Sequence, residues 1–166
     1  RFCIATEGAV YPHLSEQHLV SCAREQGCMG GHAGNVYGHM AQEGVVDDTA
    51  LPYSSGAGSF EDHMSTPNPS PTCPGSLQDH RRWFSDAASY AQGEAEMKAA
   101  LLAGGPLYVS FVVFSDFFAY SHGVYQKDAS WPGNVEEGGH AASLLGWGMD
   151  NGVRYWTCQN SWGAGW

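Results

Sequence analysis

Residues 138–163 read GGHAASLLGWGMDNGVRYWTCQNSWG, and this stretch decides the fold of the second half of the chain. It contains two runs rich in apolar and aromatic residues, 141–147 and 153–158. The dipeptide Asn151-Gly152 lies between them, and Asn-Gly between two such runs is typical of a tight β-hairpin turn. The stretch therefore predicts a two-stranded hairpin.

The same hairpin predicts a polar pair at its open end. Pairing Gly148 with Val153 across the turn puts Asn160 opposite Ala141 and makes it a neighbour of His140. An amide oxygen beside an imidazole can accept a proton from one ring nitrogen, which aims the other nitrogen at a nucleophile. The alternative is that the two residues are merely polar side chains at a strand end.

The remaining elements follow from capping residues and periodicity. Ser15 is a suitable N-cap for a first helix, and residues 35–42 predict a second helix that ends at Gly44. Residues 93–103 predict a short amphipathic helix, and 107–114 a strand.

The composition changes between Thr49 and Pro74 to serine, glycine, proline and threonine, which predicts a long irregular loop. Helices and loop thus precede the strands, an α+β order. We expect two lobes, a helical one over residues 1–85 and a β-rich one over 86–166.

The charge excludes one class of partner. The formal net charge is −10, with only seven lysines and arginines, whereas nucleic acid requires a basic face. The sequence also lacks an apolar run long enough for a membrane span. The acidity suits an acidic compartment, although plain solubility explains it equally well.

The cysteines favour an oxidising compartment over a zinc site. There are five, an odd number: Cys3, Cys22, Cys28, Cys73 and Cys158. A zinc-binding module would have to combine Cys22, Cys28, His32 and His39, whose spacing matches no common zinc pattern. We therefore expect no metal and no cofactor.

Several blocks resemble the papain family of cysteine peptidases, in the family's order and across the whole chain. The blocks are Leu14 to Cys22, Cys28-Met29-Gly30-Gly31, Phe114 to Phe117, Gly123-Val124-Tyr125, Gly138 to Ala141, Leu145 to Gly148, Tyr155-Trp156 and Asn160 to Gly163. Three of the blocks are most similar to the cathepsin B-like branch, with cathepsin C as second choice: Arg1-Phe2-Cys3-Ile4, Gly138-Gly139-His140 and Leu145-Gly146-Trp147. The resemblance implies the papain-like two-lobe fold, truncated at both ends.

The resemblance also implies roles for matching positions. His140 would be the general base and acid, and Asn160 the residue that orients it. A glycine turn would present its backbone to an extended peptide, and three further side chains would line the substrate site. These implied substrate-binding residues are Gly30, Gly31, Ala141, Ser110 and Trp162, of which Trp162 would also cover the His140–Asn160 pair. The alternative for the glycines is a simple tight turn.

The sequence departs from the family pattern at the nucleophile, because the motif that contains the catalytic cysteine is absent. In papain-type enzymes the histidine and asparagine follow that cysteine by about 130–150 residues, so the cysteine is expected near or before Arg1. The family pattern pairs Cys22 with Cys73, and Cys3 and Cys28 with upstream cysteines. Cys158 is rejected as the nucleophile, because a buried apolar thiol stays protonated.

The resemblance thus implies a cysteine endopeptidase when the protein is full length, with this segment alone inactive. The 54–76 loop has His63 without an adjacent histidine, and only one cysteine, so dipeptide-removing activity is not carried over from cathepsin B. A non-enzymatic papain-fold homologue, a binding or matrix protein whose nucleophile is replaced, is the alternative. Expected partners are peptide or protein substrates and a propeptide or protein inhibitors, in the lysosome, a vacuole or outside the cell.

Overall fold

The computed structural model describes residues 7–23, 27–54, 72–86, 88–163 and 165–166 of the chain. The chain divides into two compact units, Arg1–Tyr90 and Ala91–Trp166. The lobe boundary between residues 85 and 86 stays a prediction. Within the described ranges, no helix combines the length and the hydropathy that crossing a bilayer requires.

Two α-helices organise the N-terminal unit. Helix α2 spans Glu16–Cys22, and the Ser15 side chain caps it by accepting the His18 N–H at 2.9 Å. Helix α3 spans Ala33–Gln42, two residues longer at its start than predicted. Gly44 follows with a φ of 73°, and a Cβ there would lie 3.0 Å from the Phe84 ring, so the chain requires glycine at this position.

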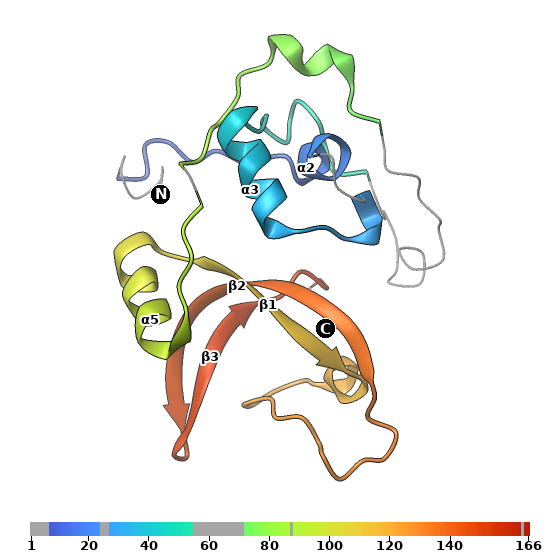
Figure 1. The fold of residues 1–166 in the computed structure, drawn as a ribbon, viewed down its shortest axis with the longest axis vertical. Coiled ribbons are helices and arrows are strands. Elements are labelled where there is room, and N and C mark those ends of the chain that lie inside the picture. The colour runs from blue at the N-terminus through green and yellow to red at the C-terminus, as the bar shows by residue number, and fades with distance from the viewer. Residues whose placement is uncertain (1–6, 24–26, 55–71, 87, 164) are drawn as a thin grey trace. The chain divides into compact units, whose positions relative to one another are not determined.

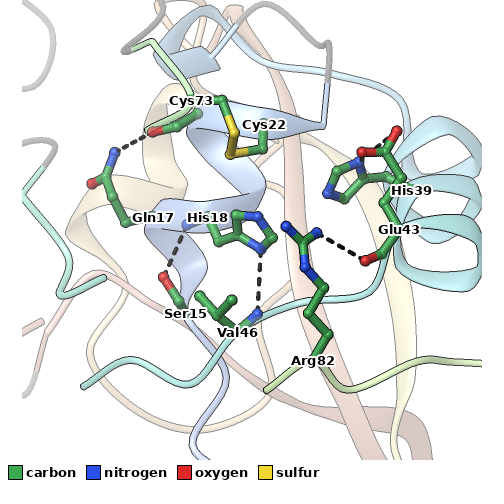
Figure 2. The surroundings of a disulfide bond; sticks show 10 residues. Ser15, Gln17, His18, Cys22, His39, Glu43, Val46, Cys73 and Arg82 are labelled. Atoms are coloured by element: carbon green, nitrogen blue, oxygen red, sulfur yellow. Dashed lines mark hydrogen bonds and ion pairs between the residues drawn. A yellow bond between two sulfur atoms is a disulfide. The ribbon is translucent and has the colours of Figure 1, made fainter. Parts of the chain in front are cut away.

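A small core and a disulfide hold this unit together. Cys22, Val46 and Leu77 form the buried apolar cluster, and Leu77 lies in the 3₁₀ helix η2, Gly75–Asp79. Cys22 and Cys73 are joined by a disulfide (Figure 2). It ties the end of α2 to the segment before η2. Most of the predicted 49–74 loop, with His63, lies outside the described residues.

The C-terminal unit is a helix followed by a three-stranded antiparallel sheet. Helix α5 spans Gly93–Gly104 and ends at Gly105, whose φ is 81°. The strands are β1 (Leu107–Phe114), β2 (Glu136–Asp150) and β3 (Val153–Gln159), with the 3₁₀ helix η3 (Ser115–Ala119) after β1. The three strands, labelled in Figure 1, have the order β1-β2-β3, so β2 pairs with both of the others. The α+β class predicted from the sequence is confirmed.

The predicted register of the hairpin is wrong by two residues. Asp150, not Gly148, pairs with Val153, so that only Asn151 and Gly152 form the loop. Both have positive φ, 48° and 82°, as a two-residue turn of the primed type requires. The two-residue turn that Asn-Gly favours therefore forms in place of the four-residue loop implied by the prediction.

A β-bulge changes the register again farther from the turn. Gly146 pairs with Thr157, but Leu144 pairs with Cys158, so Leu145 is an extra residue on β2. Beyond the bulge the register continues with Ser143 opposite Gln159, the last residue of β3. Asn160 thus follows the end of the strand, and extending the register puts it opposite Ala142 rather than Ala141.

We predict that removing the disulfide lowers the free energy of unfolding substantially. It closes a loop of 51 residues, for which the chain-entropy relation gives about 4 kcal/mol. We expect the double variant Cys22→Ala/Cys73→Ala of the complete protein to unfold at a clearly lower urea concentration. The variant Cys158→Ala, which removes an exposed thiol, is the matched control and is expected to unfold like the wild type. Equal midpoints for all three proteins would contradict a stabilising disulfide.

Candidate active site

His140 and Asn160 form the polar centre of the C-terminal unit. His140 lies on β2, Asn160 follows β3, and His140 Nε2 is 2.8 Å from Asn160 Oδ1. The same oxygen accepts the backbone N–H of Ser161 at 2.8 Å. Because a backbone N–H can only donate, the atom it points to must be the amide oxygen, which settles the orientation of the amide.

This orientation also settles the tautomer of His140. An amide oxygen has no hydrogen, so the proton of the 2.8 Å hydrogen bond belongs to Nε2 of the imidazole. In the neutral ring, Nδ1 then carries the lone pair and can accept a proton from a nucleophile. The pair has the geometry of a general base held by an orienting amide.

Aromatic rings enclose the imidazole on two sides. The Trp162 ring centroid lies 4.8 Å from that of His140, and the Phe111 ring lies 5.5 Å away, edge to face. Phe111 is the residue paired with His140 across β1 and β2. Apolar rings in these positions limit the access of water to the His140–Asn160 hydrogen bond, which strengthens it.

Two phenylalanines missed by the sequence analysis hold Trp162 in place. Phe118 stacks on Trp162 with ring centroids 5.4 Å apart and 15° between the planes. Phe117, which is 8% exposed, contacts Trp162 edge to face at 5.6 Å. Both come from η3, and the aromatic run Phe117-Phe118-Ala119-Tyr120 was the signal in the sequence that could have identified them.

Helix η3 is anchored by Asp116. Its carboxylate accepts the Tyr125 hydroxyl and the Asp128 N–H, both at 2.6 Å, and its own N–H donates to Asn134 Oδ1 at 3.1 Å. Desolvation opposes the charged form of Asp116, but these hydrogen bonds outweigh it and lower the pKa of the carboxyl. Burial, together with the bond to Asp116, raises the pKa of Tyr125 to about 12. Ionised Asp116 therefore holds the segment that carries the aromatic support.

The two side-chain positions assigned to a substrate pocket lie together on the sheet. Ser110 and Ala141 are direct partners across β1 and β2, and both are exposed. Because side chains alternate along a strand, they share the face opposite to the one carrying His140 and Phe111. The structure thus brings Ser110 and Ala141 together and brings Trp162 to His140.

The glycine turn belongs to the N-terminal unit. Gly30 has a φ of 107°, which favours glycine, and no atom lies within 4 Å of where its Cβ would be. Gly31 follows it, and both residues are exposed. An open backbone and a tight turn are both present here, so the structure is compatible with either interpretation of these glycines.

Cys158 is exposed, so the expectation of a buried thiol is wrong. The reason is its position on β3, which is an edge of the three-stranded sheet and is covered on fewer sides. It lines an open hollow of about 560 Å³ with Phe111, Leu144 and Asn160, and partial desolvation there raises the pKa of its thiol. Its partner Leu144 lies four residues from His140, a separation of about 13 Å along a strand.

The described residues offer one group with the chemistry of metal ligands, His18, Cys22 and Cys73, whose ligand atoms lie within 4.8 Å of one another. Both sulfurs belong to the disulfide, so neither is a thiolate. The zinc alternative considered from sequence also needs Cys22, which the disulfide occupies.

Comparison with known proteins places this geometry in a family. The sequence profile of the papain family cysteine proteases matches residues 1–166. The chain is 35% identical over 173 residues to cathepsin B-like CP2 of Giardia intestinalis, covering all of this chain and 53% of that protein. It is 31% identical over 195 residues to cathepsin B-like cysteine proteinase 5 of Caenorhabditis elegans, covering 56% of that protein.

Solved structures of papain-family proteins also resemble this chain. Procathepsin B S9 from Trypanosoma congolense superposes with a TM-score of 0.81 at 28% identity, covering 98% of this chain and 54% of that one. Procathepsin L2 from Tenebrio molitor gives a TM-score of 0.71 at 27% identity, covering 99% of this chain and 48% of that one.

The chain belongs to the papain family of cysteine proteases. Within that family its relatives are cathepsin B-like proteins, as the sequence resemblance predicted. The chain spans about half the length of the curated relatives it matches.

The hydrogen bond between His140 and Asn160 predicts a single tautomer. Long-range ¹H–¹⁵N NMR correlations, recorded at a pH at which the His140 imidazole is neutral, should show its proton on Nε2. In the variant Asn160→Ala the acceptor is lost, and we expect a mixture of tautomers. The variant Gln159→Ala, one residue away and exposed, should keep the wild-type pattern. A neutral wild-type imidazole with no proton on Nε2 would contradict the orientation derived for the amide.

Proposed function

We propose that the complete protein containing this chain is a cysteine endopeptidase that hydrolyses peptide bonds by a Cys-His-Asn mechanism. The observation that carries the proposal is the 2.8 Å hydrogen bond of His140 Nε2 to Asn160, because it makes Nδ1 the ring nitrogen that can exchange a proton with a nucleophile. Membership of the papain family of cysteine proteases supports the reaction class.

In the proposed mechanism a cysteine thiolate attacks the scissile carbonyl carbon, and His140 is then an imidazolium. The tetrahedral oxyanion collapses to an acyl-enzyme as His140 donates its Nδ1 proton to the leaving amine. His140 next accepts a proton from a water molecule that attacks the acyl-enzyme. Collapse of this second tetrahedral intermediate breaks the C–S bond, which releases the carboxylic acid product and restores the thiolate beside the imidazolium. Asn160 keeps the ring in position through both proton transfers.

The nucleophile in this proposal is a cysteine N-terminal to Arg1. Two observations argue against three of the five cysteines of this chain. Cys22 and Cys73 are consumed by their disulfide. Burial raises the pKa of the Cys158 thiol, and the pairing partner of Cys158, Leu144, lies four residues or about 13 Å along β2 from His140.

Gly30 and Gly31 are proposed to pair with the backbone of an extended peptide, because an exposed glycine backbone offers hydrogen bonds without a side chain in the way. Ala141 and Ser110 are proposed to line a side-chain pocket, and Trp162 to shield the catalytic pair. The partners are peptide substrates and a propeptide or protein inhibitors. A lysosomal, vacuolar or extracellular location is proposed from the disulfide and the acidic composition.

A second candidate is a non-enzymatic relative of matrix type. It is favoured by one comparison, because the chain is 29% identical over 195 residues to the mouse protein named tubulointerstitial nephritis antigen-like, of which it covers 41%. The residue at the nucleophile position of the complete gene separates the two candidates, since cysteine is required for the first. Retention of both His140 and Asn160 favours the enzyme.

The first test is hydrolysis of a fluorogenic peptide by the complete protein. We expect activity that iodoacetamide abolishes, because alkylation removes the thiolate. The variant Cys158→Ser is the matched control, and it should keep both the activity and its sensitivity to the reagent. Absence of any thiol-dependent hydrolysis would leave the non-enzymatic candidate in place, and loss of activity in Cys158→Ser would refute the assignment of the nucleophile.

The second test concerns the orienting amide. His140→Ala should lower kcat/KM by about 10⁴-fold because general acid–base catalysis is lost, and Asn160→Ala by about 10²-fold because the ring is no longer held. Gln159→Ala is expected to remain within about twofold of the wild type, the scatter expected of an exposed neighbouring position. The proposal fails if Asn160→Ala and Gln159→Ala have the same kcat/KM.

A further inference from the structure

Two histidines are buried side by side in the N-terminal unit, which does not contain the proposed catalytic pair. His18 on α2 is 1% exposed, and His39 on α3 is 8% exposed. Their ring centroids lie 5.5 Å apart with 69° between the ring planes. Neither has a role in the peptidase mechanism, and buried ionisable side chains usually need a specific reason to be there.

His18 accepts a hydrogen bond that joins two parts of the unit. The Val46 N–H donates to His18 Nδ1 at 3.3 Å, as Figure 2 shows. The Val46 side chain belongs to the buried cluster around the disulfide, and its neighbour Val45 pairs with Trp83. The neutral imidazole thus ties α2 to the segment that carries the centre of the core.

Charged and titratable groups from two segments of the unit lie around His18. His39 and Glu43 come from α3 and its C-cap, and Arg82 comes from the segment after η2 (Figure 2). The Glu43 carboxylate lies 4.0 Å from His39 Nδ1, whereas Arg82 donates to the Glu43 carbonyl oxygen at 2.9 Å. On α2 itself, the disulfide of Cys22 adds no charge.

We propose that the His18–His39 pair is an acid-sensitive latch of the N-terminal unit, closed while His18 is neutral and opened when His18 takes up a proton. A protonated imidazole has an N–H on both nitrogens and accepts no hydrogen bond. The buried Val46 N–H would then lose its acceptor, and a new positive charge would lie beside Arg82 and His39. Both changes destabilise the folded unit.

The pH range follows from the environment of His18. Burial, followed by the positive charges of His39 and Arg82, lowers the pKa of His18 from 6.5 to about 4, against the opposing effect of Glu43. The folded state therefore binds this proton less readily than the unfolded chain does. The stabilisation that neutral His18 gives to the folded state is fully present above pH 6.5, and it is lost progressively as the pH falls from 6.5 towards 4. Over that range the folding equilibrium weakens on the order of 100-fold.

Urea unfolding of the complete protein between pH 3.5 and 7.5 tests the latch. The variant His18→Asn keeps an acceptor near the position of Nδ1 but does not titrate. We expect the wild-type midpoint to fall between pH 6.5 and 4, and the His18→Asn midpoint to be much flatter over the same range. His80→Asn, an exposed histidine of the same unit, is the matched control and should decline like the wild type.

A direct titration keeps the proposal falsifiable if His18→Asn fails to fold. The ring C–H resonances of His18 in the wild-type protein should titrate well below pH 6, whereas those of His80 serve as the exposed reference. Titration of His18 near 6.5 in the folded protein would overturn the latch. So would an identical pH dependence of unfolding in His18→Asn and the wild type. Neither readout depends on peptidase activity.

Discussion

One amide oxygen, Asn160 Oδ1, is the acceptor on which the proposed chemistry of this chain depends. It receives two donors at 2.8 Å, the imidazole of His140 and the backbone N–H of Ser161. The second donor prevents the amide from turning over, so the first is always met by an oxygen. The orientation of the imidazole is thereby decided by a backbone group that no side-chain substitution at position 161 removes, except proline.

The same centre is supported by layers of contacts that reach outward. Trp162 and Phe111 contact the imidazole, Phe117 and Phe118 contact Trp162, and Asp116 holds the segment from which those phenylalanines come. Rigid placement of a reactive group by successive packed layers is the usual way in which proteins limit its movement.

The N-terminal unit is held in a different manner. Its buried residues include four polar ones, Ser15, Gln17, His18 and His39, beside a small apolar cluster. Ser15 donates to the Leu51 carbonyl at 2.6 Å, and Gln17 accepts from the Ser54 N–H at 2.8 Å. Such a core depends on directed hydrogen bonds more than on apolar area, so its stability responds to conditions that change hydrogen bonding.

Much of the architecture could be predicted from the sequence because it rests on local signals. The Ser15 cap, the Gly105 stop, the strand 107–114 and the Asn-Gly turn are each decided by a few neighbouring residues. The change of register beyond Gly146 could not be predicted, since a bulge leaves no mark in a run as rich in apolar residues as 141–147. The exposure of Cys158 could not be predicted either, because it depends on which strand lies at the edge of the sheet. The contacts of His18 join residues up to 64 positions apart along the chain and have no local signature.

The extra residue at Leu145 has a consequence for how this hairpin can evolve. Without the bulge, the register next to the turn would continue and pair Ser143 with Asn160. The Asn160 side chain would then lie on the face of the sheet opposite to His140. The bulge shifts the phase of β2 by one position and returns His140 and Asn160 to a common face. Substitutions between the two residues are therefore tolerable where packing allows, but a single insertion or deletion must be matched by a second one. Natural selection is therefore expected to preserve the number of residues between His140 and Asn160 more strictly than their identities.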